Sequence, residues 1–326
     1  MGALGPRRRR AARRAVPRRP RAGAAVTGRT AVLTIVHGRH DHLRGQLLGL
    51  QRSASVPRWH VVAAMGDPAV RDVVAEHAGP GPTETVLVDV PVGADGELPL
   101  ARARNAAAAA AVERGAELLV LLDVDCVPSP GLLGAYERAA RAVAADPGAP
   151  GPALLCGAVT YLPEGVLVRT AEDLDRLPGL TRPHRARPAP APGEVRRAEE
   201  SQWWLFWSLS FATTARDWQR FGGFSEEYRG YGGEDTDVAA TVRSLGGSLH
   251  WVGGADAFHQ HHPTQDPPVQ HLDAILRNVA VFQRRWGWHP MGGWLERFRE
   301  LGLVDYDAAT SSWTAVRAAT ERRIDS

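Results

Sequence analysis

The sequence predicts an α/β fold in which a mostly parallel sheet is flanked by helices. Short apolar runs rich in β-branched residues recur along the chain, and segments with helical spacing alternate with them. Strands that alternate with helices are typical of βαβ units and a parallel sheet. The length of 326 residues suits one large domain or two small ones.

The expected elements follow one another in a regular order. The strands are expected at residues 30–36, 59–65, 84–90, 117–125, 153–162 and 248–252, where the content is apolar and β-branched. Helices are expected at residues 100–115 and 271–282, and a further helix is expected to start at a cap formed by Ser129 and Pro130. Two more are indicated by leucines and valines on one helical face: Leu43, Leu47 and Leu50 in the first, and Val238, Val242 and Leu245 in the second.

Two segments depart from this alternation. Residues 1–29 contain ten arginines and no acidic residue, and their Arg, Ala, Pro and Gly composition cannot form a core, so we expect a disordered tail. Residues 163–200 are rich in proline and arginine and are expected to form a flexible loop. A single domain then spans residues 30–285, and residues 286–326 form a C-terminal helical extension.

The tail also explains the basic character of the chain. The formal net charge is +3, and because the tail carries ten positive charges, residues 30–326 carry −7. Such a tail either contacts an anionic surface or is a solvated leader without a role. Both interpretations stay open: the first would place the chain peripherally at the inner face of an anionic membrane, and neither calls for a nucleic-acid partner.

Composition also restricts the cellular setting. No stretch approaches the roughly 18 apolar residues of a membrane span, and the N-terminus lacks the apolar region of a secretory signal. The two cysteines, Cys126 and Cys156, are too few for a disulfide framework. A reducing cytoplasm is therefore the expected location.

The first candidate site is the pair Asp123 and Asp125 in "LLDVDC", where an apolar strand ends. In an open parallel sheet, ligands bind beyond the carboxyl ends of the strands. Residues two apart share a strand face, so both carboxylates can reach one hard cation. The D-x-D spacing recurs three times elsewhere, but only this copy follows a buried strand and precedes a capped helix.

The second candidate site is "FHQHHP", residues 258–263, in which three histidines fall within four residues. A zinc hydrolase would also use several histidines, but no H-E-x-x-H or C-x-x-C spacing accompanies them. A mixed set of two aspartates and a histidine suits manganese better than magnesium, because imidazole is a poor partner for the harder ion. Mn²⁺ or Mg²⁺ is therefore the expected cofactor.

The third candidate site is "RGYGGEDTD", residues 229–237, which combines an aromatic residue, two adjacent glycines and three carboxylates. The glycines indicate a tight backbone or the close approach of another group. Acids are favoured at a helix N-terminus by the helix dipole, so the segment fits a helix start as well as a site of chemistry.

In this order, "ARARN", "LLDVDC", "RFGGFSEEYRGYGGEDTDVAATVRSLGG" and "FHQHHP" resemble the nucleotide-sugar glycosyltransferases of the GT-A fold, over roughly residues 30–285. The resemblance is greatest to family-two inverting enzymes with a galactosyltransferase-type C-terminal half. It implies a Rossmann-like GT-A sheet and a metal-dependent transfer of a sugar. The implied donor is a nucleotide-diphosphate sugar, a UDP-sugar, and the implied acceptor is a hydroxyl group of a carbohydrate or glycoconjugate.

The resemblance also implies which residues bind the metal and the nucleotide. Asp123 and Asp125 match the aspartates that hold Mn²⁺ on the donor diphosphate. His259 matches the histidine that completes the metal shell, and His262 fits the second half of the same H-x-x-H-P motif. The residues implied on the nucleotide side are Arg104 and Asn105, at a helix start, and Asp67, which would reach the uracil.

The glycine-rich segment supplies the implied catalytic residues. Asp235 matches the catalytic base, and Glu234 matches its acceptor-binding neighbour. Tyr231 matches an aromatic residue that lines the sugar site. The remaining expectations are that Gly232 and Gly233 leave room for a sugar, that Trp207 contacts the sugar or the acceptor, and that Asp237 only serves the helix that follows.

Other functions fit parts of the same pattern. A retaining transferase would keep the metal set and use Asp235 differently. A nucleotidyltransferase would need a glycine-rich basic loop after the first strand, of which "VHGRHDH" is a poor version. A non-enzymatic carbohydrate-binding protein would use Trp203, Trp204 and Trp207 to stack on sugars, but it would leave the metal set and the acid pair unexplained.

Overall fold

The structure, a computed structural model, describes residues 25–26, 28–77, 81–148 and 150–316. Most of the predicted tail, residues 1–29, lies outside this range, and so do residues 317–326 of the predicted extension. No helix in the described ranges is long and apolar enough to cross a membrane.

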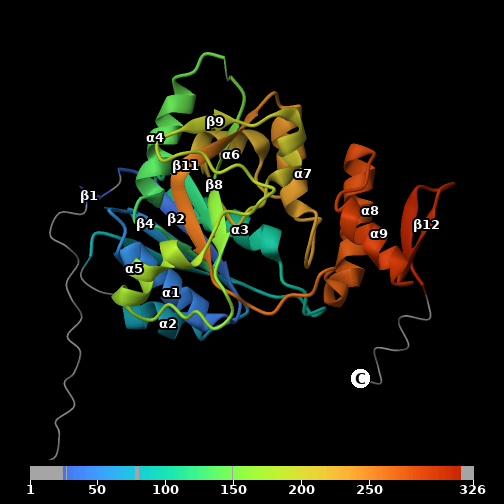
Figure 1. The fold of residues 1–326 in the computed structure, drawn as a ribbon, viewed down its shortest axis with the longest axis horizontal. Coiled ribbons are helices and arrows are strands. Elements are labelled where there is room, and N and C mark those ends of the chain that lie inside the picture. The colour runs from blue at the N-terminus through green and yellow to red at the C-terminus, as the bar shows by residue number, and fades with distance from the viewer. Residues whose placement is uncertain (1–24, 27, 78–80, 149, 317–326) are drawn as a thin grey trace, which may run out of the picture.

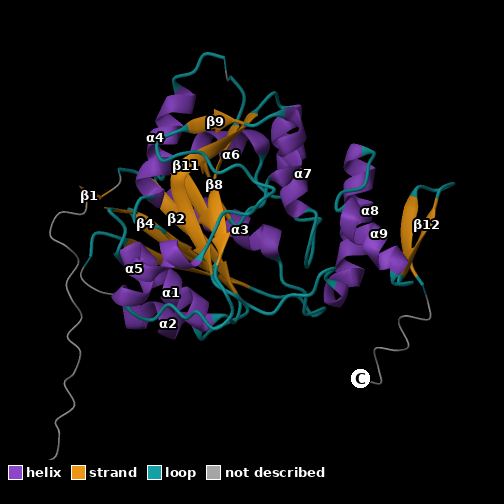
Figure 2. Cartoon of the chain, viewed as in Figure 1, coloured by secondary structure: helices purple, strands orange, loops and turns teal. Residues whose placement is uncertain are grey.

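One large sheet forms the centre of the molecule (Figures 1 and 2). Its strand order is β5-β4-β2-β6-β10-β8-β11-β7, and β9 pairs with β11. The strands are β2 (Thr30–Val36), β4 (Trp59–Met65), β5 (Glu84–Val90), β6 (Leu118–Leu122), β7 (Cys126–Pro128), β8 (Ala153–Tyr161), β9 (Val195–Arg197), β10 (Ser210–Thr214) and β11 (Ser248–His259). A separate parallel pair joins β1 (Ala25–Val26) to β3 (Ser55–Val56).

The first half of the sheet is parallel and the second half is mixed. Strands β5, β4, β2 and β6 are parallel neighbours, as the alternation of strands and helices predicts. Strand β10 is antiparallel to both β6 and β8. Strands β8 and β11 are parallel to each other, and the short strands β7 and β9 pair antiparallel with β11.

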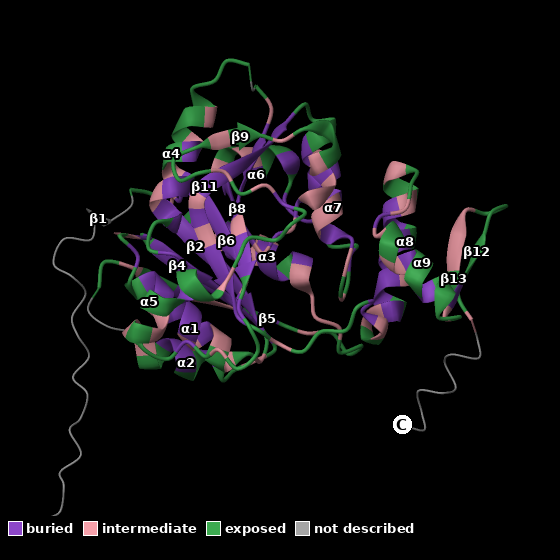
Figure 3. Ribbon diagram, in the orientation of Figure 1, coloured by how far each residue is buried: buried purple, intermediate pink, exposed green. Residues whose placement is uncertain are grey.

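Helices cover both faces of the sheet, and the alternation of side chains along β2 shows this directly. Leu33 and Ile35 lie in the cluster that contains the alanines of α3, whereas Val32 packs with α4 and Val36 with α1. Figure 3 shows the buried strands between helices whose outer sides are exposed. These helices are α1 (His40–Gln51), α2 (Val70–His77), α3 (Leu100–Glu113), α4 (Leu132–Ala144), α6 (Ala215–Phe221) and α7 (Glu234–Ser244).

Two predictions about local structure are wrong. Helix α4 starts at Leu132 with Gly131 as its N-cap, so the predicted cap at Ser129 and Pro130 is wrong. The segment 163–200 contains α5 (Ala171–Leu180) and β9, although proline and arginine suggested only a loop. The N-cap Thr170 starts α5, because its hydroxyl accepts from the backbone N–H of Asp173 while the Asp173 carboxylate accepts in return.

The C-terminal part is helical only in its first half. Helices α8 (Leu272–Trp286) and α9 (Gly292–Glu300) are followed by a hairpin of β12 (Val304–Asp307) and β13 (Ser312–Ala315). The aromatic rings of Tyr306 and Trp313 face each other across the hairpin with centroids 4.9 Å apart, which is a pairing that stabilises strands. Figure 1 shows this part at one side of the sheet, beside α7.

Asp237 joins α7 to this C-terminal part. Its carboxylate is buried and accepts from the Tyr228 hydroxyl at 3.1 Å, from Arg285 Nε at 2.8 Å and from Trp286 Nε1 at 2.7 Å. The expectation that Asp237 only serves the start of its helix is therefore incomplete. The carboxylate holds three donors at once, two of them from α8, although the guanidinium of Arg285 also contacts Glu227.

Replacing Asp237 with Ala should lower the free energy of unfolding by about 3 kcal/mol, because three donors lose one buried charged acceptor. Chemical denaturation monitored by circular dichroism measures this change. Asp72→Ala, at an exposed acid in the first turn of α2, is the control and should change the same free energy by less than about 0.5 kcal/mol. Equal small effects of both substitutions would contradict the joining role of Asp237.

Candidate functional site

The pairing of β7 with β11 brings the aspartate and histidine motifs together. Cys126, the first residue of β7, lies opposite His259, the last residue of β11. Just beyond this pair, the backbone N–H of Gln260 donates to the carbonyl of Asp125 at 2.7 Å. The residue that precedes β7 and the residue that ends β11 are therefore neighbours, although 134 positions of sequence separate them.

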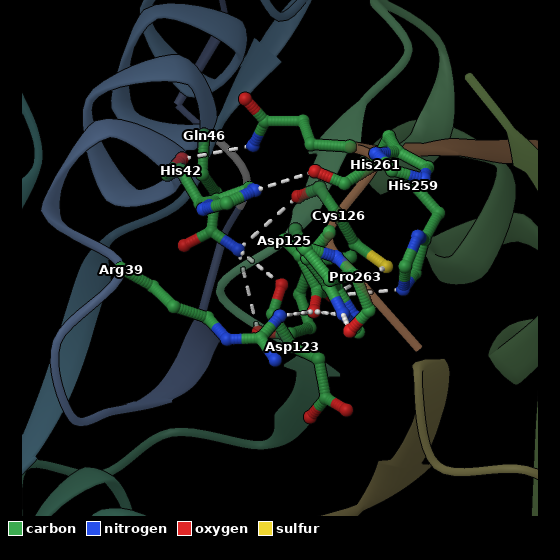
Figure 4. Close-up of polar contacts among 12 residues, drawn as sticks. Arg39, His42, Gln46, Asp123, Asp125, Cys126, His259, His261 and Pro263 are labelled. Atoms are coloured by element: carbon green, nitrogen blue, oxygen red, sulfur yellow. Dashed lines mark hydrogen bonds and ion pairs between the residues drawn. The ribbon is translucent and has the colours of Figure 1, made fainter. Parts of the chain in front are cut away.

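Asp125, His259 and His262 form a group suited to one metal ion. Their ligand atoms lie within 4.8 Å of one another. Each imidazole Nε2 lies 3.5 Å from a different oxygen of the Asp125 carboxylate. Figure 4 shows Asp125 and His259 converging beside β7. The side chain of His261 is exposed and lies outside this group, and only its carbonyl is engaged, by His42 Nε2 at 3.2 Å.

The charges of this group also fit metal binding. Burial opposes the ionisation of Asp125, but the two imidazoles and the guanidinium of Arg39 outweigh it and lower the pKa of Asp125 to about 2. Burial lowers the pKa of His259. At neutral pH the group therefore offers a carboxylate and a neutral imidazole, the forms that bind metals. One oxygen and two nitrogen donors fit a divalent transition ion such as Mn²⁺ better than Mg²⁺.

Asp123 faces a different partner. Its Oδ1 accepts from Arg104 Nη2 at 3.3 Å, and Arg104 Nη1 lies 3.5 Å from Glu234 Oε1. Burial raises the pKa of Asp123 to about 6, although Arg104 opposes the rise. The expected set of Asp123, Asp125 and His259 is thus arranged differently, with His262 in the place of Asp123. The buried Arg104 of α3 links the aspartate motif to the acid pair of α7.

The acid pair begins α7. The Oδ2 atom of Asp235 accepts from the backbone N–H of Ser208 at 3.0 Å. Its Oδ1 atom is buried and has no hydrogen-bond partner among the described residues. Burial and the neighbouring charge of Asp235 raise the pKa of Glu234 to about 7, against the effect of Arg104. Near neutral pH, Glu234 therefore carries a proton part of the time, and Asp235 keeps one oxygen free for a ligand.

The two glycines before the acid pair are needed for the backbone. Gly232 and Gly233 have φ values of 98° and 94°, which residues with a side chain rarely adopt. A Cβ atom would lie 3.0 Å from Met291 Sδ at Gly232 and 3.2 Å from Tyr228 at Gly233. Protein atoms thus occupy the space beside both glycines, where we expected room for a sugar.

The aromatic candidates lie on two sides of the acid pair. Tyr231 stacks on His271 and Trp294 of the C-terminal part, with ring centroids 4.7 and 5.9 Å away. Trp207 precedes Ser208, and its ring lies edge to face with that of His184, with ring centroids 5.1 Å apart. Further contacts, between His184 and Tyr161 at 6.0 Å and between Tyr161 and His259 at 4.9 Å, complete an aromatic row. We call Tyr161, His184 and Trp207 the aromatic wall.

The nucleotide candidates divide into two groups. Asp67 accepts from the backbone N–H of Gly38 at 2.7 Å and pairs with His40 Nε2 at 2.9 Å, so it lies at the carboxyl ends of β2 and β4. Asn105 is occupied elsewhere. Its amide donates to the carbonyl of Phe224 at 2.8 Å and accepts from the backbone N–H of Phe224 at 2.9 Å, which attaches α3 to the turn before the glycine-rich segment.

Sequence reasoning missed two residues of this site. Arg39 donates to Asp125 Oδ2 at 2.8 Å. Gln46 of α1 is fully buried and donates to the carbonyls of Asp123 at 2.8 Å and Cys126 at 3.1 Å, so it fixes the loop that carries both aspartates (Figure 4). A polar residue beside Leu47 on the apolar face of α1 was the available signal for Gln46. Nothing local marked Arg39, because its partner lies 86 positions away.

Parts of the chain are similar to known glycosyltransferases. A family described as "N-terminal domain of galactosyltransferase" matches residues 198–263, which include the acid pair and the histidine motif. Two curated relatives are the validoxylamine A glucosyltransferases of Streptomyces hygroscopicus subsp. jinggangensis and subsp. limoneus. They are 28% and 26% identical over 88 residues, or 27% of this chain, and the matches span 20% and 18% of the relatives.

Among solved structures, the crystal structure of S. aureus TarS, residues 1–349, superposes with a TM-score of 0.52 at 9% identity and covers 78% of this chain and 66% of that chain. This likeness concerns the fold. The fold expected from the sequence is thus confirmed: the chain has the GT-A fold of glycosyltransferases, with a galactosyltransferase-type segment over residues 198–263.

Proposed function

We propose that the chain is a metal-dependent inverting glycosyltransferase that moves a sugar from a nucleotide-diphosphate sugar, a UDP-sugar, to a hydroxyl group of a carbohydrate or glycoconjugate acceptor. One observation carries the proposal. Asp125, His259 and His262 offer three donors to one metal, and the half-buried Asp235 at the start of α7 keeps a buried oxygen without a partner among the described residues. Arg104 connects the two segments, because it contacts Asp123 and Glu234.

The metal would be held by Asp125, His259 and His262. When bound there, a divalent ion supplies positive charge that stabilises the departing diphosphate. Arg39 already contacts Asp125 and adds a second positive charge at the same place. Asp67, near the ends of β2 and β4, remains the proposed contact to the nucleotide base.

Asp235 is the proposed base. The acceptor oxygen attacks the anomeric carbon while the bond from that carbon to the diphosphate oxygen breaks, and the acceptor proton passes to Asp235 Oδ1. The hydrogen bond from Ser208 N–H to Oδ2 orients the carboxylate and leaves Oδ1 for the acceptor. Glu234, with its raised pKa, suits the binding of an acceptor hydroxyl better than proton removal.

The non-enzymatic alternative loses its main support. Trp203 is buried in the core, and Trp204 meets the edge of Trp288 with centroids 4.8 Å apart. Of the three tryptophans that we considered for stacking on sugars, only Trp207 lies along the aromatic wall.

The metal assignment predicts unequal effects within the histidine motif. Asp125→Asn and His262→Ala should each weaken Mn²⁺-dependent binding of UDP by about tenfold or more, since the first removes the negative charge of a ligand and the second removes a ligand. His261→Ala is the control and should change the affinity less than twofold. Isothermal titration calorimetry with and without chelator measures these affinities. Equal loss in His261→Ala, or binding that chelator leaves intact, would contradict the assignment.

The base assignment predicts a loss in turnover alone. Asp235→Asn keeps the hydrogen bond from Ser208 but cannot take the proton, so turnover should fall by about 10² to 10⁴. The affinities for UDP and Mn²⁺ should stay unchanged, and the anomeric configuration of the product should be inverted. Turnover close to that of the wild type, or a product that retains the donor configuration, would refute this role.

The raised pKa of Glu234 predicts a pH-dependent stability. The folded state holds this proton up to about pH 7, whereas the ordinary pKa is 4.5, so the free energy of unfolding should fall as the pH rises between these values. Glu234→Gln should remove the part of this fall that Glu234 contributes, which amounts to at most about 3 kcal/mol, whereas the smaller part from the raised pKa of Asp123 should remain. Urea unfolding at pH 5 and pH 8 measures it. Glu113→Gln, at an exposed acid of α3, is the control and should leave the fall in place.

Contact of the arginine-rich tail with an anionic membrane remains a prediction. The structure suggests where to cut, because Arg29 binds the carbonyl of Gly115 and the carboxylate of Glu117, and β1 pairs with β3, so both should be kept. Deleting residues 1–24 should abolish sedimentation with phosphatidylserine vesicles at low salt and preserve activity on a soluble acceptor. Unchanged sedimentation of the truncated chain would rule out this role.

A further inference from the structure

A buried guanidinium without a hydrogen-bond partner lies behind the aromatic wall. The side chain of Arg187 belongs to a residue that is only 7% exposed. In the part of the chain that the structure describes, none of its nitrogens Nε, Nη1 and Nη2 has a hydrogen-bond partner. Its Cζ atom lies 5.1 Å from the ring centroid of Trp207 and 5.2 Å from that of Trp251.

Two indole rings do not replace the hydrogen bonds that a guanidinium loses on burial. Contacts with aromatic faces compensate part of the cost, but a desolvated charge normally also has a hydrogen-bonded partner. A charge held in this way indicates a missing anion. A second unsatisfied group is attached to the segment of Trp207. The backbone N–H of Ser208, the next residue, binds Asp235, whose Oδ1 also lacks a partner among the described residues.

The position of Arg187 points to the transferred sugar. The aromatic wall runs from His259 of the metal group to Trp207, next to the residue that binds Asp235. A sugar whose diphosphate lies at the metal and whose anomeric carbon faces Asp235 must lie along this wall. The segment that leads to Arg187 also lies beside Tyr161, because Pro183 forms a bridge with Thr160.

We infer that Arg187 binds a carboxylate on the transferred sugar, so that the donor is a nucleotide-activated uronic acid. This inference rests on the proposed function. The planar fork of a guanidinium matches a carboxylate through two parallel hydrogen bonds. Trp251 is 1% exposed and closes one side, so the carboxylate enters past the half-buried indole of Trp207, which must turn aside.

A neutral hexose would leave the guanidinium unpaired. A site rejects a substrate that leaves its buried polar groups without partners, so a neutral sugar should bind less tightly.

Calorimetry with UDP-glucuronate, UDP-glucose and UDP in the presence of Mn²⁺ tests the inference. The wild type should bind UDP-glucuronate about tenfold or more tightly than UDP-glucose. Arg187→Gln should remove this preference and leave the affinity for UDP unchanged.

Two further variants make the test specific. Arg187→Lys keeps the charge but loses the fork and should retain part of the preference. Arg185→Gln, at an exposed arginine two residues away, is the matched control and should behave as the wild type. If Arg187→Gln does not fold, the affinities of the wild type and of Arg187→Lys for UDP-glucuronate and UDP-glucose still test the inference.

Equal affinity of the wild type for the two sugar nucleotides would overturn the inference, and so would a preference that survives in Arg187→Gln. An effect of Arg187 variants only on reaction with an anionic acceptor would place the carboxylate on the acceptor and also overturn it. Failure of the wild type to bind UDP with Mn²⁺ would instead refute the proposed function, so the two failures are distinguishable.

Discussion

The short antiparallel pairing of β7 with β11 is the constraint on which the candidate site depends. Only three residue pairs make this ladder, and its last pair sets Cys126 opposite His259. A shift by one residue would turn His259 to the other face of the sheet and separate it from Asp125. The register is supported from outside the sheet as well, because Gln46 of α1 and the backbone of Gln260 both bind the loop that carries Asp125.

The second constraint is the balance of buried charge. Four carboxylates, those of Asp123, Asp125, Glu234 and Asp235, lie within a small region, and arginines divide them into two groups. Arg39 accompanies the metal group, whereas Arg104 binds Asp123 and Glu234 together. This division places Asp123 with Arg104 and Glu234 and not with Asp125, His259 and His262, despite its D-x-D spacing. Arg104 makes no hydrogen bond to Asp235, whose buried Oδ1 lacks a partner among the described residues.

Much of the fold was predictable because its signals are local. The strands 30–36, 59–65 and 84–90 were predicted at the bounds that the structure has. The first two are fully buried, nearly continuous apolar runs, and the third is a partly exposed edge strand rich in valine. The helix cap at Thr170 and the hairpin at 304–315 were missed, because proline-rich and charged surroundings obscured short-range signals. The length of β11 was underestimated, because Gly253 and Gly254 interrupt its pattern where the register shifts.

The candidate site was predictable only in its residue types. Motif order predicted that Asp125, His259, Glu234 and Asp235 share one site, but spacing could not show that His262, and not Asp123, lies within reach of both Asp125 and His259. The position of Asp123 depends on Arg104 of α3, whose contacts are 19 and 130 positions away in sequence. Arg187 was unpredictable for the same reason, since its environment is made by two tryptophans from distant strands and loops.

The central claim is that Asp125, His259 and His262 hold one divalent ion against the donor diphosphate. Electron–nuclear double resonance of the Mn²⁺–UDP complex measures the ligands directly. We expect hyperfine couplings of the Mn²⁺ ion to two imidazole nitrogens and to phosphorus. One nitrogen coupling should be lost in His262→Ala, and both should be kept in His261→Ala. Phosphorus coupling without any nitrogen coupling, or a nitrogen coupling lost in His261→Ala, would contradict the central claim.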